Sequence, residues 1–326
     1  MKKIYNIGII GAGHIAGKMA RTLAQVKETN VLAVGSRTLE KAQSFAQEFG
    51  VERAYGSYEE VFQDQDVDLV YIATPHSHHY APARQALLHD KPVLMEKAFT
   101  NNAKEAEELI RLSHERGVYL GEAIWTRYMP ISHKIKELME SGIIGEPRMI
   151  NACLSYKVDH KERVIRPELG GGALLDLGVY LLNFARMYFG TDIRQTISSC
   201  QGGPTGVDVQ ESITLTYTDG KMANLMCGVI SRIDRQAVIG GTEGYLKIDN
   251  VNNPGRIEVY RNFDLVETHT TPQDIVTGYE YQVLESCRCI EEGLVESPMM
   301  PHAEILSIMQ QMDALRGEWG VRFPGE

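Results

Sequence analysis

The stretch that decides the fold is Gly8-Ile9-Ile10-Gly11-Ala12-Gly13-His14-Ile15-Ala16, which joins an apolar run at 4–10 to a helical pattern at 14–27. It ends in the pattern GxGxxA, in which Gly11 permits a tight turn, Gly13 lets a pyrophosphate approach the backbone, and the small last residue lets the helix pack closely. The N-terminus of that helix offers free N–H groups to phosphates. A GxGxxG motif alone is often only a turn, but this one follows a strand pattern and opens a helix. We therefore predict a dinucleotide-binding loop.

Strand-like and helix-like patterns alternate through the first 122 residues. The expected strands lie at 4–10, 31–36, 67–74, 92–95 and 118–121. The expected helices lie at 14–27, 39–49, 79–89 and 102–116. Repeated alternation favours a parallel sheet with helices on both faces. We expect residues 1–122 to form a dinucleotide-binding domain of the Rossmann type.

The pattern changes after residue 122. The expected helices of this part lie at 131–140, 173–189, 278–290 and 302–316. Strands dominate from residue 193, and Asp219-Gly220 is a hairpin signal between two of them. Short strands joined by tight turns favour antiparallel pairing. The predicted fold class is therefore α/β, with the Rossmann domain followed by an α+β substrate-binding domain at 123–326, whose mostly antiparallel open sheet offers one face to a partner.

Composition limits the kind of protein. The 326 residues are 43% hydrophobic and 23% charged, which is typical of a globular chain. A net charge of −10, from 33 basic and 43 acidic side chains, disfavours binding to nucleic acid or to an anionic membrane surface. The five cysteines include no CxxC, which favours reduced thiols. Because there is neither a signal-peptide pattern nor an apolar run near the ~18 residues of a membrane helix, we expect a cytoplasmic protein.

The end of the second expected strand bears on the choice of cofactor. An NAD site usually places Asp or Glu there to bind the ribose 2′-hydroxyl, whereas this chain has Ser36 and Arg37. A carboxylate would repel a 2′-phosphate, while a guanidinium pairs with one. The alternative is a solvated arginine at the start of a loop. We predict NADP(H) as the preferred cofactor, with NAD(H) as the alternative.

Three histidines lie in Thr74-Pro75-His76-Ser77-His78-His79, directly after the third expected strand. Their spacing does not match HExxH, and no carboxylate or cysteine lies near them in the sequence, so we predict no metal site. Ligands of parallel sheets bind at the carboxyl ends of the strands. We therefore predict that this loop contacts the cofactor.

The pair Glu96-Lys97 follows the expected strand at 92–95. The dipeptide alone fits a surface ion pair at a strand end. Its position at the carboxyl end of a parallel strand instead favours a role for Lys97 beside a reacting oxygen, where its charge would lower the pKa of a neighbouring acid.

The segment Gly170-Gly171-Gly172-Ala173-Leu174-Leu175-Asp176-Leu177-Gly178-Val179-Tyr180 leads three glycines into an apolar helix. Asp176 and Tyr180 are four residues apart and so share one helix face. One interpretation is a core tyrosine bonded to an aspartate near a helix cap. The other is a phenol that exchanges a proton with a substrate hydroxyl. A cation such as Lys97 would lower the phenol pKa from its usual value of about 10 toward neutrality.

Several motifs together resemble the Gfo/Idh/MocA family of glucose–fructose oxidoreductases and inositol dehydrogenases. They are GIIGAGHIA (8–16), VGSR (34–37), ATPHSHH (73–79), MEKAFT (95–100), GEAIWTRYMP (121–130), SGIIGEPR (141–148) and GGGALLDLGVY (170–180). The chain is most similar to the branch of dimeric dihydrodiol dehydrogenases and NADP-dependent D-xylose dehydrogenases, which has Tyr where many members have His at position 180. It departs from the common EKP and Thr-Pro-Asn patterns at Ala98 and His76.

The resemblance implies hydride transfer between the nicotinamide and a polyol, sugar or cyclic diol, or the matching carbonyl. It implies that Lys97 and Tyr180 face the nicotinamide, Lys97 as electrostatic assistant and Tyr180 as proton donor or acceptor, and that Asp176 orients Tyr180 or a substrate hydroxyl. Trp125 and Arg127 would line the substrate pocket, although Trp125 fits a core position equally well. The expected cofactor-binding residues are Gly11, Gly13, His14, Ile15, Ser36, Arg37, Thr74, Pro75, His76, His79, Glu96 and Lys97.

The resemblance also implies a homodimer formed through the open sheet of the second domain. Two other functions stay open: a dinucleotide-binding sensor or regulatory protein without catalysis, and a reductase of a non-sugar carbonyl. A sensor should lack the lysine or the proton donor, and this chain has both. Three cations before the glycine-rich segment, Lys161, Arg163 and Arg166, are expected to be solvated rather than bound to an anionic substrate.

Overall fold

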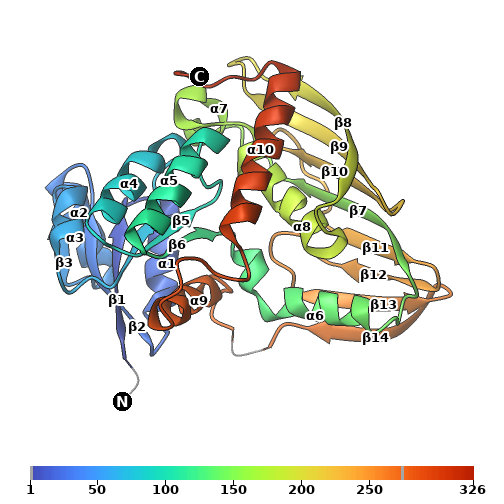
Figure 1. Ribbon diagram of the computed structural model, residues 1–326, viewed down its shortest axis with the longest axis horizontal. Helices are drawn as coiled ribbons and strands as arrows, with labels where there is room; N and C mark the ends of the chain where they lie inside the picture. Colours follow the sequence, from blue (N-terminus) through green and yellow to red (C-terminus); the bar gives the residue numbers. More distant parts are fainter. Residues whose placement is uncertain (1–2, 273–274) are drawn as a thin grey trace. The chain divides into compact units, whose positions relative to one another are not determined.

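The computed structural model describes residues 3–272 and 275–326, which form two compact units (Figure 1). The first unit consists of Met1–Trp125 together with Val276–Gln310, and the second of Thr126–Ile275 together with Gln311–Glu326. Each unit has a sheet and a buried core of its own. Within the described ranges, no helix is both long enough and apolar enough to cross a membrane.

The first unit is built on a six-stranded parallel sheet with the strand order β3-β2-β1-β4-β5-β6. Its strands are β1 (Tyr5–Ile10), β2 (Thr29–Gly35), β3 (Arg53–Tyr55), β4 (Leu69–Ile72), β5 (Val93–Glu96) and β6 (Leu120–Ala123). Every residue of β4 and β5 is buried, which is typical of parallel strands covered on both faces. The predicted Rossmann sheet is confirmed.

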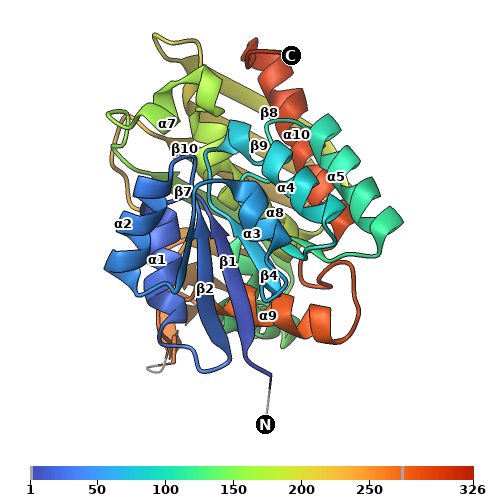
Figure 2. The same cartoon turned by 90° about the vertical axis from the view of Figure 1, so that its left-hand side faces the viewer.

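The helices that pack on this sheet form two groups. They are α1 (His14–Leu23), α2 (Leu39–Phe49), α3 (Tyr58–Gln63), α4 (Tyr80–Leu88), α5 (Ala103–Arg116) and α9 (Glu280–Glu291). Helix α1 contacts α2 and α9, whereas α4 contacts α3 and α5 (Figure 2). The side chains of Thr38, Ser57 and Asn102 cap α2, α3 and α5 by accepting hydrogen bonds from backbone N–H groups. The sequence pattern does not predict β3 or α3, because such short elements show no period.

The segment 276–310 completes the first unit from far along the chain. The N–H of Leu120, on the outer strand β6, donates to the carbonyl of Val295 at 2.9 Å. A ring nitrogen of His302 lies 2.8 Å from the carbonyl oxygen of Leu120. The hydroxyls of Tyr119 and Ser286, the latter on α9, are hydrogen-bonded at 3.0 Å. These contacts occupy the edge that β6 would otherwise present to solvent.

The second unit is built on an eight-stranded sheet with the order β14-β13-β12-β11-β7-β10-β9-β8. Neighbouring strands are antiparallel except for β7 and β10. The strands are β7 (Pro147–Ser155), β8 (Ile193–Gly202), β9 (Asp208–Tyr217), β10 (Met222–Gly228), β11 (Ala237–Gly241), β12 (Gly244–Ile248), β13 (Arg256–Arg261) and β14 (Asp264–Thr270). The predicted hairpin at Asp219-Gly220 joins β9 to β10, with Gly220 at a φ of 86°. The mostly antiparallel second sheet is confirmed.

Helices cover one face of this second sheet. The helices of the unit are α6 (Pro130–Glu140), α7 (Glu162–Ile165), α8 (Val179–Phe189) and the end of α10 (His302–Trp319). Helix α8 packs against β7 and β10 (Figure 1). The turn that precedes it, Leu174–Gly178, is π-helical rather than α-helical. On β10 the buried residues alternate with exposed ones, and Met222 and Met226 are among the exposed. The two faces of the sheet therefore differ in burial.

Asp64 fastens β3 to the loop before β4. Its carboxylate accepts hydrogen bonds from Arg53 Nη1 at 2.8 and 2.9 Å and from the Tyr55 hydroxyl at 2.9 Å. The N–H of Asp66 donates to it at 3.0 Å. Burial raises the pKa of Asp64, but these hydrogen bonds outweigh burial, so the pKa of the carboxyl lies below its usual value.

We expect Asp64→Asn to lower the free energy of unfolding by about 1–3 kcal/mol at neutral pH, because the amide loses the charge-assisted hydrogen bonds. A carboxyl whose pKa is lowered by folding stabilises the protein above its unfolded pKa, near ~3.9, and loses this effect as pH falls through the folded value. The difference from wild type should therefore shrink in acid. Urea unfolding at about pH 7 and about pH 3 measures it. Asp264→Asn, at an exposed position, is the control, and a difference that does not change with pH would contradict the prediction.

Candidate cofactor and active site

Two glycines shape the loop between β1 and α1 for different reasons. Gly11 has a φ of 99°, and a Cβ on it would lie 3.0 Å from the carbonyl oxygen of Ala73. Gly13 has an ordinary φ of −93°, and a Cβ on it would meet nothing within 4 Å. Gly13 is also the N-cap of α1 and brings no side chain to the first N–H groups of the helix. The loop therefore fits a dinucleotide pyrophosphate, which needs both the open space and the free N–H groups.

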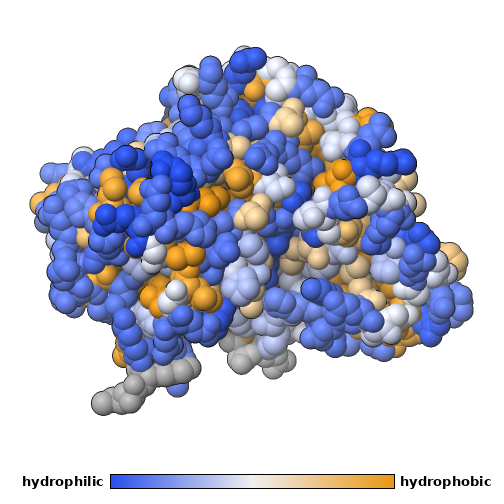
Figure 3. Space-filling model, viewed as in Figure 1, coloured by the Kyte–Doolittle hydropathy of each residue, from blue (hydrophilic) through white to orange (hydrophobic). Residues whose placement is uncertain are grey.

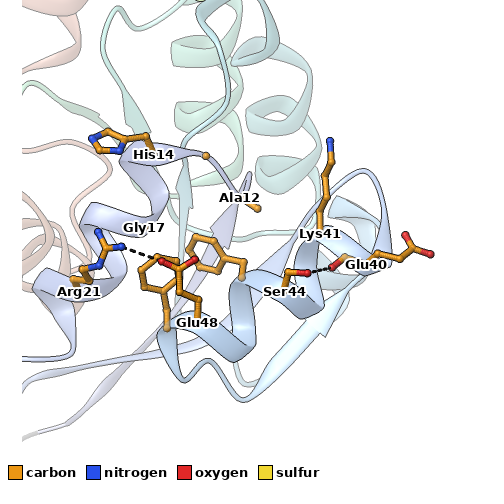
Figure 4. A pocket seen from close by; sticks show the side chains of 11 residues that line it. Ala12, His14, Gly17, Arg21, Glu40, Lys41, Ser44 and Glu48 are labelled. Carbon is orange, nitrogen blue, oxygen red and sulfur yellow. Dashed lines mark hydrogen bonds and ion pairs between the residues drawn. The ribbon is translucent and has the colours of Figure 1, made fainter.

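A pocket of about 580 Å³ opens beside this loop, between α1 and α2 (Figure 4). His14 of the loop and Lys41 of α2 are among its lining residues. Deeper along the helices, Arg21 pairs with Glu48 at 3.0 Å. A Cβ at Gly17 would lie 2.7 Å from the ring of Phe49, so this glycine allows the close packing of α1 on α2.

The end of β2 presents cations at the start of α2. Ser36 is buried and Arg37 is exposed. Burial raises the pKa of Tyr58, and the charge of Arg37 opposes that rise, which places the guanidinium near the phenol. The Thr38 hydroxyl caps α2 by accepting from the N–H of Lys41 at 3.4 Å. A helix N-terminus flanked by Arg37 and Lys41 suits an anionic group.

The ring of His79 ties together the loops that follow β4 and β5. Its Nε2 lies 2.8 Å from the carbonyl oxygen of Thr74, and its Nδ1 lies 2.9 Å from that of Ala98. Burial lowers the pKa of His79 to about 4, although the carbonyls oppose the shift. His76 is buried beside it, with the ring centroids 5.8 Å apart. His79 therefore braces the two loops, because both of its ring nitrogens face backbone carbonyls.

Glu96 and Lys97 lie at the carboxyl end of β5. Glu96 is buried and accepts a hydrogen bond from the hydroxyl of Tyr71 on β4. Lys97 is half-buried, and its peptide bond to Ala98 is cis. Burial lowers the pKa of Lys18 on α1, and the charge of Glu96 opposes that shift. Glu96 is thus within electrostatic reach of a second cation besides Lys97, namely Lys18 of α1.

Lys18 also contacts an aromatic pair. The rings of Trp125 and Tyr279 are stacked, with centroids 4.1 Å apart and planes at 14°. Lys18 Nζ lies 4.4 Å from the centroid of Tyr279 and 5.6 Å from that of Trp125. A cation over aromatic faces is attracted to their negative electrostatic potential. Trp125, only 3% exposed, is therefore held between the end of β6 and the start of α9.

In the second unit, polar side chains lie in a row on an otherwise apolar helix. Asp176, in the π turn, is buried and accepts a hydrogen bond from Arg163 Nη1 at 2.9 Å. Tyr180 is buried four residues on, and Asn183, three further, accepts from Arg127 Nε at 2.6 Å. Residues at these spacings share a helix face. We call Asp176, Tyr180 and Asn183 the polar row; an arginine is bonded at each end of it.

The two domains of one known family cover most of this chain. The profile of the Gfo/Idh/MocA oxidoreductase family, with its NAD-binding Rossmann fold, matches residues 5–123. The profile of the Gfo/Idh/MocA C-terminal domain matches residues 132–247. The chain belongs to the Gfo/Idh/MocA family. The predicted family and the predicted oxidoreductase class are thereby confirmed.

Relatives of this Gfo/Idh/MocA protein include trans-1,2-dihydrobenzene-1,2-diol dehydrogenases. That of Mus musculus is 34% identical over 97% of both chains, and that of Danio rerio is 34% identical over 96% of both. Among solved structures, a 3-ketoreductase from Actinomadura kijaniata in complex with NADP and TDP-benzene is 26% identical. It has a TM-score of 0.87 and covers 97% of this chain and 98% of its own. These relatives support a nicotinamide cofactor and a small-molecule substrate.

Several residues of these clusters are not predicted by the sequence. Arg163 was expected to be solvated, but its guanidinium binds Asp176 although the side chain is 45% exposed. Asn183 follows Tyr180 at helical spacing, a signal that could have identified it. Lys18 stands out only as a lysine among small and apolar residues in α1, and Tyr279 carries no local signal. The roles of the predicted catalytic and cofactor-binding residues stay predictions.

The two glycines of the loop provide a matched pair of variants. We expect Gly13→Ala to leave the free energy of unfolding nearly unchanged but to weaken NADPH binding about tenfold or more, because the methyl group enters the space left for the pyrophosphate. Gly11→Ala should instead destabilise the fold by about 1–2 kcal/mol, because of its positive φ. Urea unfolding and nicotinamide fluorescence titration separate the two effects. Equal behaviour of the two variants would contradict this assignment.

Proposed function

We propose that this protein is an NADP-dependent dehydrogenase or reductase that acts on a polyol, sugar or cyclic diol, or on the matching carbonyl compound. The observation that carries the proposal is the polar row, which buries a phenol beside a carboxyl in an apolar helix and bonds an arginine at each end. Burying such groups is costly, so their retention favours a chemical role. A diol dehydrogenase and a ketoreductase among the relatives agree with this class of substrate.

In the oxidative direction, Tyr180 takes the proton of the substrate hydroxyl as the hydride leaves the carbinol carbon. The nicotinamide, when bound, supplies the hydride acceptor at its C4. Lys97 stabilises negative charge on the substrate oxygen and favours the phenolate form of Tyr180. Asp176 orients Tyr180 or a substrate hydroxyl, and the contact with Arg163 holds its carboxyl group in place. In the reductive direction Tyr180 returns the proton to the new alkoxide.

We assign the dinucleotide to the carboxyl ends of β1, β2, β4 and β5. Gly13 leaves space for the pyrophosphate at the start of α1. Arg37 and Lys41 suit the 2′-phosphate that distinguishes NADP from NAD. Of the loop after β4, His79 contributes by bracing the backbone rather than by offering a ring nitrogen to the ligand. Glu96, beside Lys97, is assigned to the nicotinamide end.

We assign Trp125 and Arg127 to the substrate site. Stacking on Tyr279 fixes the plane of Trp125, and the hydrogen bond to Asn183 fixes the guanidinium of Arg127. Both side chains are therefore held in one orientation, which suits a rigid binding wall. We further propose a homodimer through the open face of the second sheet, where Met149, Met222 and Met226 are exposed.

The preference for NADP rests on Arg37. We expect Arg37→Asp to weaken NADPH binding by about 2 kcal/mol or more, because a carboxylate would repel the 2′-phosphate, while NADH binding changes little. Fluorescence titration with both nucleotides measures the two dissociation constants. Arg232→Asp, in a loop of the second unit, controls for the change in net charge. Equal loss for NADPH and NADH would show that Arg37 does not read the 2′-phosphate.

The catalytic assignment rests on Lys97 and Tyr180. We expect Lys97→Met and Tyr180→Phe each to lower kcat by about three orders of magnitude or more, with NADPH binding largely kept. Tyr188→Phe is the matched control, because Tyr188 lies on the same helix and donates to the Ser132 carbonyl at 3.1 Å. Steady-state rates with sugars and diols, next to NADPH titration, decide the question. Near-normal turnover in both variants would contradict the catalytic roles of Lys97 and Tyr180. A wild-type protein that binds NADPH but turns over no substrate would favour the alternative of a non-catalytic sensor.

A further inference from the structure

The start of the π turn rests on a carboxylate from a neighbouring strand. Oδ2 of Asp208, the first residue of β9, accepts a hydrogen bond from the N–H of Leu174 at 2.6 Å. Gly172 has a φ of 124°, and a Cβ on it would lie 2.2 Å from Oδ1 of Asp208. Ala173, the N-cap of the turn, makes no side-chain capping bond. Asp208 therefore supplies the cap that the glycine-rich segment lacks, and it occupies the space that a side chain at position 172 would fill.

The end of the π turn rests on a second carboxyl from the same strand. A Cβ at Gly178 would lie 3.1 Å from Oε1 of Glu211 and 3.4 Å from Sγ of Cys227. The Cys227 thiol donates to the same Oε1 at 2.7 Å. Gly178 thus lets the helix backbone close on Glu211. Both ends of one turn are fitted to β9, and Asp176 lies between them.

The two carboxyls are deeply buried, which is costly for such polar groups. Asp208 is 1% exposed and Glu211 is 2% exposed. Among the residues that the structure describes, Asp208 Oδ1 and Glu211 Oε2 have no hydrogen-bond partner. Burial raises the pKa of both groups, and the charge of Asp208 raises that of Glu211 further. Each carboxyl therefore buries one oxygen without a hydrogen bond, which costs free energy that the contacts of its other oxygen must offset.

The geometry of a π turn gives the two carboxyls a purpose. Such a turn holds one residue more than an α-helical turn, and π-helical insertions are frequent at functional sites. Asp176 lies inside this turn and Tyr180 lies just beyond its end, so a shift in the backbone of the turn would move the Asp176 carboxylate relative to the Tyr180 phenol.

We propose that Asp208 and Glu211 are positioning residues for the reaction: from β9 they hold the two ends of the π turn and thereby keep Asp176 in line with Tyr180. The inference rests on the proposed function, in which Tyr180 exchanges the substrate proton.

Asp208→Ala and Glu211→Ala test the two ends separately. Each should lower kcat about tenfold or more, while the Kd for NADPH, measured without substrate, stays within about threefold of wild type. The midpoint of the kcat–pH profile should also move, because Tyr180 loses its aligned carboxylate neighbour. A defect that only reduced the amount of folded enzyme would lower the profile without moving its midpoint.

Conservative variants separate positioning from charge. Glu211→Gln should keep kcat within about threefold of wild type, because the amide keeps the size of the side chain and an oxygen that can accept from the Cys227 thiol. Asp208→Asn should lower kcat by more than about threefold, because it loses the negative charge at the start of the helix. Glu146→Gln removes an exposed carboxylate from the same unit and should change neither kcat nor the profile.

The outcomes distinguish this inference from the proposed function. If both alanine variants keep the wild-type kcat and pH profile while Tyr180→Phe is inactive, the inference is overturned and the proposed function stands. If Tyr180→Phe turns over normally, the proposed function itself fails. If an alanine variant does not fold, the two volume-conserving variants decide, and equal kcat values for Asp208→Asn and Glu211→Gln overturn the inference.

Discussion

Free N–H groups at helix starts are the constraint on which both halves of this protein depend. At the start of α1, Gly13 brings no capping side chain, and the space beside it is open. The start of the π turn also lacks a capping side chain of its own, and there the carboxyl group of Asp208 on β9 accepts a hydrogen bond from the free N–H of Leu174. A buried helix end must find a partner. The start of α1 is exposed and leaves its N–H groups to solvent or a ligand, whereas the buried start of the π turn is capped by a residue of its own sheet.

Charge is organised locally rather than by the net balance of −10. Glu96 lies within electrostatic reach of Lys18, and Asp176 is bonded to Arg163, so each of these buried carboxyl groups has a cation near it. His79, by contrast, faces backbone carbonyls with both ring nitrogens and serves as a brace. An acidic chain can therefore present cations where phosphates and developing oxyanions are expected, because short-range pairing outweighs distant charge in a screened solvent.

Local sequence patterns predict the parts of this protein that depend on neighbours in the chain. The apolar runs of β4 and β5, the glycine loop and the spacing of Asp176 and Tyr180 are of this kind. Lys18, Trp125 and Tyr279 meet only because three distant segments converge, which no local pattern reveals. Of the two carboxyls of β9, Glu211 follows the alternation of buried residues along the strand, whereas Asp208 does not, because the register between β8 and β9 shifts near Gly202.

The contribution of 276–310 to the first unit has a consequence for biosynthesis. Strand β6 leaves the ribosome early, yet the residues that occupy its outer edge, near Val295, emerge only after the whole second sheet. At ~5–20 residues per second, a nascent chain carries that open edge for about 10–30 s. Exposed strand edges pair readily with other strands, so the nascent chain is most prone to aggregate during this interval. A chaperone that covers the edge would act in the same interval. A truncated mRNA that ends before codon 276 would encode a chain in which the outer edge of β6 stays exposed.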